Sequence, residues 1–278
     1  MQIVCLDLEG VLVPEIWIEF ATRTGIPELR RTTRDEPDYD KLMKYRLALL
    51  AEHRLGLPDI QQVIAAMGPF DGARAFVDGL REHYQLIILS DTFYEFAHPL
   101  MRQLGWPTLF CHSLEAGADG MLVRYHLRMP DQKREAVRRL KELRFTVVAA
   151  GDSYNDTAML AEAHAGILFH PPENVIREFP QFPVTRSFSE LRQAIRVSGF
   201  IAQHAGWILE SSYHADEGSG DGDGRYFMRM EVKADSLPFH LAEFRERFRP
   251  LAEELAMDWK ISDSAVKRRV VIMVSKQE

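Results

Sequence analysis

The sequence predicts an α/β fold in which helices cover both faces of a mostly parallel sheet. Four short apolar runs have the length and composition of buried strands, and amphipathic helical patterns separate them. These runs are residues 3–8, 86–90, 146–150 and 165–169. Three of them end in acid or hydroxyl clusters, in "CLDLEG", "ILSDTF" and "AAGDSYND". Functional groups gather at the carboxyl ends of parallel strands, so these clusters predict a site there.

Between the first two runs, residues 15–82 carry mainly helical patterns, in "EIWIEFATRTG", "YDKLMKYRLALLAEH" and "LPDIQQVIAAMG". So long a connection between neighbouring strands predicts an inserted helical subdomain instead of a loop. Because it directly follows the first strand, we expect it to cover the strand ends as a cap. The predicted core is residues 1–13 and 83–195, and the predicted cap is about residues 14–82.

A second composition shift falls near residue 195. The pieces that follow predict a small α+β module at residues 196–278: "WILESSYHA", "DEGSGDGDG", "RYFMRMEVKA", "PFHLAEFRERFRPLAEELAM" and "RRVVIMVSK". The acidic piece at 216–224 lacks the ligand spacing of a calcium loop, so we expect a flexible hairpin loop.

Composition narrows the function classes. The 278 residues are 46% hydrophobic and 27% charged, which is typical of a globular protein with a sizeable core. A net charge of −7 disfavours nucleic acids and anionic membranes as partners. With no signal-peptide pattern and no apolar run of membrane-spanning length, we expect a cytoplasmic protein. Cys5 lies in an apolar run, which favours a buried, reduced thiol.

The strand-end clusters contain the groups that phosphoryl transfer needs. Asp7 is a carboxylate that can attack phosphorus and form an aspartyl phosphate. Glu9, two residues later in an extended chain, is expected on the same side as a general acid and base. Ser90 can hydrogen-bond a phosphate oxygen, and the backbone N–H groups of Asp91 and Thr92 are expected to open a helix that favours anions.

A lysine and two further acids complete the predicted set. Lys133 in "MPDQKREAV" would balance the charge of the phosphate and the carboxylate. Asp152 and Asp156 stand four residues apart at a helix start, and with Asp7 and Glu9 they predict a Mg²⁺ site. Each feature alone has a plainer explanation, such as a solvated strand end, a helix cap or a surface lysine. The prediction rests on their order along the chain.

These motifs resemble the haloacid dehalogenase superfamily of phosphatases. The signature of that superfamily, a DxDGx strand end, a Ser/Thr strand end, a lysine and a GDxxxD loop, is matched by "DLEGV", "LSD", Lys133 and "GDSYND". Glu9 stands where most phosphatase members carry Asp, and a glutamate can still do acid/base work. The resemblance covers about residues 1–195 and implies a Rossmann-like core, a helical cap and Mg²⁺ dependence.

Longer stretches resemble one subgroup, the ThrH-type phosphoserine phosphatases, which can also pass the phosphoryl group to homoserine. These stretches include "DLEGVLVPEIWIEFA", "LSDTFYEFAHPLMRQLG" and "TTRDEPDYDKLMK". The resemblance implies a role in serine and threonine biosynthesis. It supports Arg46 as the group that holds the substrate carboxylate and Glu15 as the acceptor of its ammonium, with Thr92 also touching the substrate. The plainer alternatives are a solvated helix-face arginine and a helix-start acid.

From Val197 onward the chain resembles the amino-terminal ACT domain of formyltetrahydrofolate deformylases, an arrangement βαββαβ. The first strand of this arrangement is absent, so the ferredoxin-like module is expected to be incomplete. The deformylase catalytic domain is also absent, so no deformylase activity is expected. Losing a central strand leaves unpaired edges. Either the flanking strands pair directly, or a second copy supplies the partner in a homodimer.

The main expectation is a Mg²⁺-dependent phosphoserine phosphatase with phosphoryl transfer to homoserine. Three alternatives stay open at this point. The first is a phosphatase for another small phosphate monoester. The second is a non-enzymatic phospho-acceptor like a receiver domain, which uses a similar set of acids, hydroxyl and lysine. The third is a regulatory or scaffold protein that acts through its tail.

Overall fold

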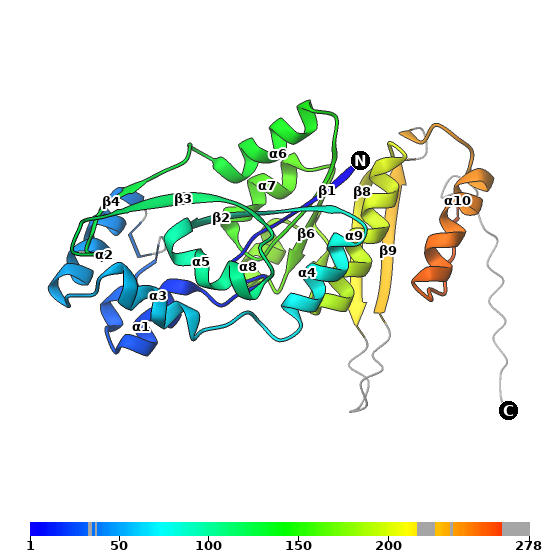
Figure 1. The fold of residues 1–278 in the computed structure, drawn as a ribbon. Coiled ribbons are helices and arrows are strands. Elements are labelled where there is room, and N and C mark those ends of the chain that lie inside the picture. Colours follow the sequence, from blue (N-terminus) through cyan, green and yellow to red (C-terminus); the bar gives the residue numbers. More distant parts are fainter. Residues whose placement is uncertain (33–34, 37, 216–225, 234–235, 263–278) are drawn as a thin grey trace, which may run out of the picture.

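A computed structural model describes residues 1–32, 35–36, 38–215, 226–233 and 236–262. Its centre is a seven-stranded sheet in the order β4-β3-β2-β1-β5-β6-β7 (Figure 1). All neighbouring strands are parallel except β3 and β4, which confirms the predicted α/β class. The strands are β1 (Gln2–Leu6), β2 (Gln85–Phe93), β3 (Thr108–Ala116), β4 (Leu122–His126), β5 (Thr146–Gly151), β6 (Ala165–Phe169) and β7 (Val184–Thr185).

The central strand β1 is buried on both faces, which explains its unbroken apolar sequence. Val4 and Leu6 point into one hydrophobic core, and Ile3 and Cys5 point into the other. The burial of Cys5 matches the expectation from its apolar surroundings. Strand β1 ends at Leu6, two residues before the end of the predicted run.

Helices form a layer on each face of the sheet. Helices α4 (Ala73–Arg81), α5 (Tyr94–Gln103) and α9 (Phe188–Gln203) pack on one face, and α6 (Gln132–Glu142) and α7 (Thr157–Glu162) pack on the other. The short elements η2 (Tyr154–Asp156) and α8 (Glu173–Glu178) lie in the connections around α7, β6 and β7. Helix α9 begins at a cap, because the hydroxyl of Ser187 accepts a hydrogen bond from the N–H of Glu190.

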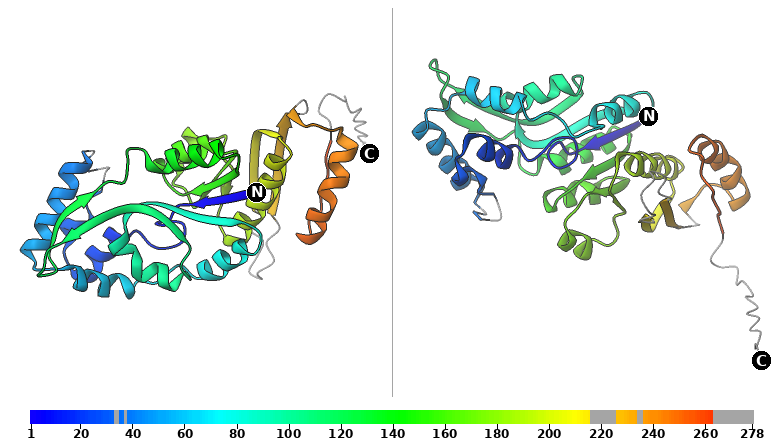
Figure 2. Two further views of the ribbon diagram at one scale, coloured as in Figure 1. Left: turned by 45° about the horizontal axis from the view of Figure 1, so that its top comes forward. Right: turned by 90° about the horizontal axis from the view of Figure 1, so that it is seen from below.

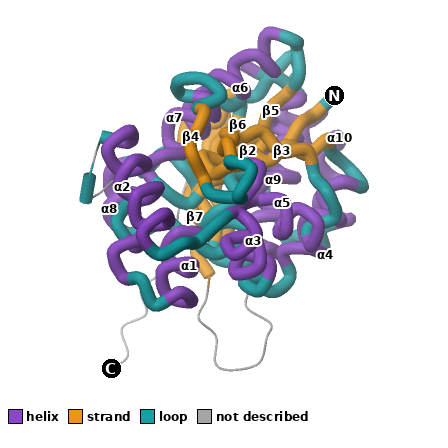
Figure 3. Tube along the Cα trace, turned by 60° about the vertical axis from the view of Figure 1, so that its left-hand side comes forward, coloured by secondary structure: helices purple, strands orange, loops and turns teal. Residues whose placement is uncertain are grey.

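The segment after β1 forms the expected helical cap at the carboxyl ends of the strands (Figure 3). It consists of α1 (Ile16–Thr24), η1 (Pro27–Arg30), α2 (Tyr39–Glu52) and α3 (Leu57–Ala65). The hairpin of β3 and β4, which the sequence patterns did not predict, packs β4 against α2. Helix α4, the last of the predicted insertion, packs instead on β2 and α9.

The tail contributes an antiparallel pair, β8 (Trp207–Ala215) and β9 (Tyr226–Lys233), and helix α10 (Leu241–Glu254). Helix α9 crosses the predicted boundary at 195/196 without a break, and Val197 and Ile201 pack with Phe244 and Phe248 of α10 in a separate small core. Both views in Figure 2 place the tail at the end of the molecule opposite the cap. The predicted acidic loop at 216–224 and the predicted last strand at 268–276 lie outside the described residues.

Candidate active site

A buried lysine joins two acids from different strand ends. Asp7 directly follows β1, and Asp156 lies in the loop after β5. The ammonium of Lys133, from the first turn of α6, lies 2.9 Å from the Asp7 carboxylate and 2.8 Å from the Asp156 carboxylate. All three side chains are almost completely buried, so the plainer explanation of Lys133 as a surface lysine does not hold.

The loop after β5 fixes Asp156 and places Asp152 against Gly10. One oxygen of Asp156 accepts hydrogen bonds from the N–H groups of Asp152 and Ser153, at 3.0 and 3.1 Å. Two glycines leave room for the carboxylates: a Cβ added at Gly151 would lie 2.4 Å from Asp156, and one added at Gly10 would lie 2.4 Å from Asp152. Gly10 also has a φ of +77°, in the region that favours glycine.

Oxygens of Asp7, Asp152 and Asp156 all lie within 4.8 Å of one another. Burial and the neighbouring acids together raise the pKa of Asp7 well above its usual range and that of Asp152 to about 7. Burial alone would lower the pKa of Lys133, but Asp156 and Asp7 raise it, so this lysine stays charged. One lysine cation does not balance three clustered carboxylates, of which Asp7 and Asp156 are buried and Asp152 is half-buried. Hard carboxylate oxygens favour Mg²⁺, so these residues fit the predicted ion.

Glu9 lies beside this group, and its side chain is not among the three clustered carboxylates. Glu9 lies beyond the end of β1, just before a turn, and its carboxylate accepts a hydrogen bond from the N–H of Ile16 at 2.9 Å, at the start of α1. Burial and the neighbouring Glu15 together raise the pKa of Glu9 to about 7. A carboxyl group with this pKa can both give and take a proton near neutral pH.

The helix expected to open at Asp91 and Thr92 does not begin there, so that prediction is wrong. Strand β2 runs to Phe93 and α5 begins at Tyr94, because pairing of Phe93 with His112 of β3 keeps the chain extended. The backbone N–H of Thr92 instead donates to the hydroxyl of the buried Ser90 at 3.2 Å. These groups still lie at the carboxyl end of β2, as the strand-end argument requires.

Gln132 and His112 are site residues that the sequence patterns missed. The Gln132 amide donates to the Ser90 carbonyl at 2.5 Å and to the Asp91 carboxylate at 3.2 Å. Nε2 of His112 lies 3.8 Å from Asp91. Together with Lys133 they line a cavity of about 320 Å³. Gln132 could have been found from the sequence, because it directly precedes Lys133. His112 could not, because it lies on the β3–β4 hairpin, which was not predicted.

Arg46 on α2 is buried within the cap, which excludes the solvated alternative. Its guanidinium stacks on the Trp17 ring at 4.3 Å and donates to the Arg31 carbonyl at 2.7 Å. Within the described residues, no carboxylate pairs with Arg46, and its buried Nε has no hydrogen-bond partner. Burial lowers its pKa to about 10, so it remains a cation. Glu15 is exposed at the start of α1, close enough to Glu9 and Asp152 to raise their pKa values.

Comparisons with known proteins agree with this geometry. A family model described as haloacid dehalogenase-like hydrolase matches residues 1–164. Phosphoserine phosphatase ThrH of Pseudomonas aeruginosa is 64% identical over 193 residues, which cover 69% of this chain and 94% of that protein. A solved complex of a phosphoserine phosphatase with bound substrate shares the fold, with a TM-score of 0.58 at 18% identity, covering 70% of this chain and 97% of that one.

A further relative matches only a small part of the chain. Formyltetrahydrofolate deformylase of a Corynebacterium species is 35% identical over 82 residues, which cover 30% of this chain and 27% of that protein. Because the match covers only 27% of the deformylase, we do not assign deformylase activity to this chain. No helix among the described residues is long and apolar enough to cross a membrane.

Proposed function

Because this chain belongs to the haloacid dehalogenase-like hydrolase family, we propose that it is a Mg²⁺-dependent phosphatase that hydrolyses phosphoserine through an aspartyl phosphate on Asp7. The observation that carries the proposal is the pairing of Asp7 with Lys133 at 2.9 Å, beside Asp152 and Asp156 and under a cap that holds Arg46. The high identity to a relative named phosphoserine phosphatase supports the choice of substrate.

In the first step an oxygen of Asp7 attacks phosphorus, and the bond to the seryl oxygen breaks. Protonated Glu9 gives its proton to the leaving oxygen, and Lys133 and Ser90 stabilise the charge of the phosphoryl oxygens. A magnesium ion held by Asp7, Asp152 and Asp156 would supply further positive charge that offsets the repulsion between nucleophile and substrate.

In the second step water attacks the phosphorus of the aspartyl phosphate, and Glu9 takes the proton of that water. Phosphate leaves, and the Asp7 carboxylate is restored. Glu9 therefore alternates between acid and base, a role that its pKa of about 7 supports.

Substrate selection is assigned to the cap. Arg46, a buried cation with an unused donor, would hold the carboxylate of phosphoserine as a bidentate pair. Glu15, at the start of α1, would accept from the ammonium, and Thr92 would contact the substrate beside Ser90. These groups lie around the strand ends, where the phosphate is expected.

Transfer to homoserine would use the same aspartyl phosphate, with the alcohol of homoserine in place of water. The share of transfer depends on how well the closed cap excludes water.

A homodimer through the tail also stays a prediction. Strand β9 pairs with β8 within the described residues, but the predicted last strand lies outside them. The division into core, cap and tail is kept as a proposal, with α9 shared by core and tail.

The test is steady-state phosphate release from phosphoserine, with and without Mg²⁺ and homoserine, for the native chain and Asp7→Asn. We expect many turnovers per chain, dependence on Mg²⁺, and loss of activity in the variant. Higher kcat/KM for another phosphate monoester in a panel of phosphorylated metabolites would favour the first alternative. Release of about one phosphate per chain would favour a phospho-acceptor, and a biological role that persists in Asp7→Asn would favour a scaffold.

A further inference from the structure

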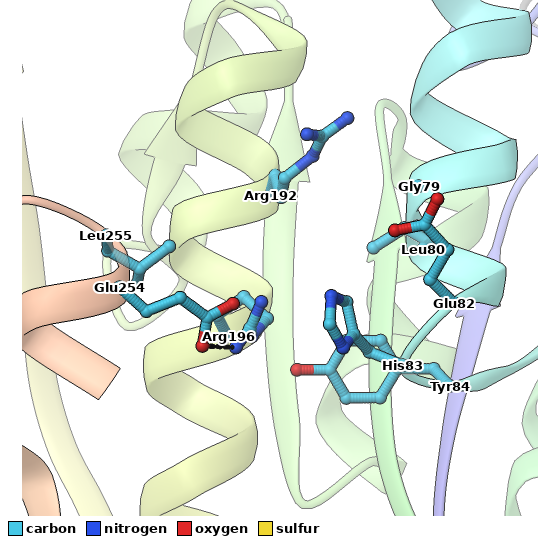
Figure 4. Close-up of a pocket in the computed structure, with 9 residues that line it drawn as sticks. All are labelled: Gly79, Leu80, Glu82, His83, Tyr84, Arg192, Arg196, Glu254 and Leu255. Carbon is cyan, nitrogen blue, oxygen red and sulfur yellow. Dashed lines mark hydrogen bonds and ion pairs between the residues drawn. The ribbon is translucent and has the colours of Figure 1, made fainter. Parts of the chain in front are cut away.

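A second cavity, of about 210 Å³, lies where the tail meets the core (Figure 4). The core side contributes His83 and Tyr84, which precede β2, and the tail side contributes Glu254 and Leu255 at the end of α10. Helix α9 forms a third wall. This cavity lies at the opposite end of β2 from Ser90, so it is separate from the candidate active site.

Arg192 on α9 brings a positive charge to this cavity, whose lining also contains the acids Glu82 and Glu254. Within the described part of the chain it forms no ion pair and no hydrogen bond. Its guanidinium lies against Gly79 of α4, where an added Cβ would be 3.0 Å from a guanidinium nitrogen. The bare backbone at Gly79 therefore leaves room for the arginine head group.

Arg196, one helical turn further along α9, is held in place by the tail. Its side chain is 13% exposed, and one of its nitrogens lies 2.5 Å from the Glu254 carboxylate. A guanidinium has five N–H donors, and this single contact with Glu254 leaves others available to a ligand. Glu254 thus orients Arg196 without using all its hydrogen-bonding capacity.

Tyr84 adds a neutral donor. It is 8% exposed, and its hydroxyl forms no hydrogen bond with any residue in the described ranges. Figure 4 shows this hydroxyl directed toward Arg196. Burial raises the pKa of Tyr84, so the hydroxyl keeps its proton at neutral pH and remains a donor. Because the Tyr84 side chain lines the cavity, its hydroxyl can donate to an acceptor that enters it.

We propose that this cavity binds a small oxyanion, the carboxylate or phosphate group of a metabolite of amino-acid size, between Arg192 and Arg196 with Tyr84 as a third donor. Arginine recognises the planar or tetrahedral oxygens of such groups through paired N–H donors. The volume, about 210 Å³, lies below the roughly 300–1,000 Å³ of sites for drug-sized ligands, so the ligand is small.

The site depends on the tail, because Glu254 orients Arg196 and Leu255 closes one side. The P. aeruginosa relative aligns over 193 residues, 94% of its length, and so has no room for a counterpart of α10. The site therefore belongs to the fused chain. A ligand bound there would join α9 and α10 to the start of β2.

The test uses phenylglyoxal, which modifies accessible guanidinium groups, on the full chain, with the rate at each arginine followed by mass spectrometry. The probes are inorganic phosphate, L-serine and acetate. Their choice rests on the proposed function, whose products are serine and phosphate, but the labelling rate at Arg192 does not report on catalysis. Failure here therefore leaves the proposed function untouched. Arg124 on β4, an exposed arginine far from the tail in Figure 1, is the control in the same sample.

We expect at least one probe to slow modification of Arg192 threefold or more while Arg124 is unaffected. Protection by phosphate alone identifies a phosphate group, and protection by serine or acetate identifies a carboxylate. Tyr84→Phe should raise the probe concentration needed for protection about fivefold, as expected for one lost hydrogen bond. Unchanged labelling of Arg192 with every probe, equal protection of Arg124, or an unchanged concentration in Tyr84→Phe would overturn the proposal.

Discussion

Lys133 lies 2.9 Å from Asp7, and this buried contact connects α6 to the end of the central strand. The same ammonium reaches Asp156 at 2.8 Å, so one cation holds the two acid-bearing strand ends together. In the absence of bound ions it balances part of the charge that burial makes costly. We therefore expect Lys133 to affect both the stability of the fold and the chemistry of the candidate site.

Replacing this lysine by methionine should lower both the stability of the fold and the activity. Lys133→Met keeps the side-chain length but leaves buried acids without their cation, which costs about 3–5 kcal/mol in the free energy of unfolding. We expect a loss of that size in urea denaturation without added Mg²⁺, and at least a 100-fold loss of kcat. Lys141→Met on the same helix is the control. Its pair with Glu162 is partly exposed, so about 1 kcal/mol or less should be lost. Equal stability of the two variants would contradict the structural role of Lys133.

Removing Asp152 should weaken metal binding more than folding. Asp152→Asn takes one of the three clustered carboxylates away from the ion but keeps the shape of the loop. We expect the Mg²⁺ concentration for half-maximal activity to rise at least tenfold, and chelation by EDTA to abolish activity reversibly in the native chain. Asp131→Asn, an exposed acid paired with Arg134, should leave the Mg²⁺ titration unchanged. An unchanged titration in Asp152→Asn would exclude Asp152 as a ligand.

Gly151 should not tolerate a methyl group. A Cβ at this position would lie 2.4 Å from Asp156, so Gly151→Ala must displace that acid and its contact with Lys133. We expect at least a 100-fold loss of kcat. The matched control is Gly25→Ala at the end of α1, where φ is +70° and no atom lies within 4 Å of the added Cβ. It should cost about 1 kcal/mol of stability through backbone strain and leave kcat unchanged. Native activity in Gly151→Ala would show that the loop can relax.

The core of this fold was predictable because its strands are buried on both faces and therefore appear as unbroken apolar runs. Asp7, Ser90 and Asp152 lie at or near the ends of three of those runs, and their order along the chain with Lys133 predicted the candidate site. The β3–β4 hairpin was not predictable in the same way, since its burial is irregular and many of its side chains are exposed. Burial of Lys133 was also hidden, because it results from tertiary contacts with acids distant in sequence.

Arg46 should govern recognition of the substrate carboxylate. We expect Arg46→Met to raise KM for phosphoserine at least tenfold, because a charged hydrogen-bonded pair is lost, with a smaller change for p-nitrophenyl phosphate, which has no carboxylate. Lys44→Met on the same helix α2 is the control, since Lys44 pairs with Asp40 at the surface. An equal loss for both substrates in Arg46→Met would indicate a structural role of Arg46 within the cap.

Closure of the cap should set the partition of the aspartyl phosphate between water and homoserine. The hydroxyl of Tyr125 on β4 donates to Asp40 on α2 at 2.5 Å, and this bond joins the hairpin to the cap. Tyr125→Phe removes it and should admit water to the closed site more often. We expect the ratio of phosphohomoserine to phosphate, measured at fixed homoserine, to fall about fivefold, the effect of one hydrogen bond of about 1 kcal/mol. Tyr154→Phe removes a comparable exposed hydrogen bond, to Glu178 of α8, which lies outside the cap and the hairpin. This variant should leave the ratio unchanged. The same ratio in both variants would mean that closure does not depend on the contact between the hairpin and the cap.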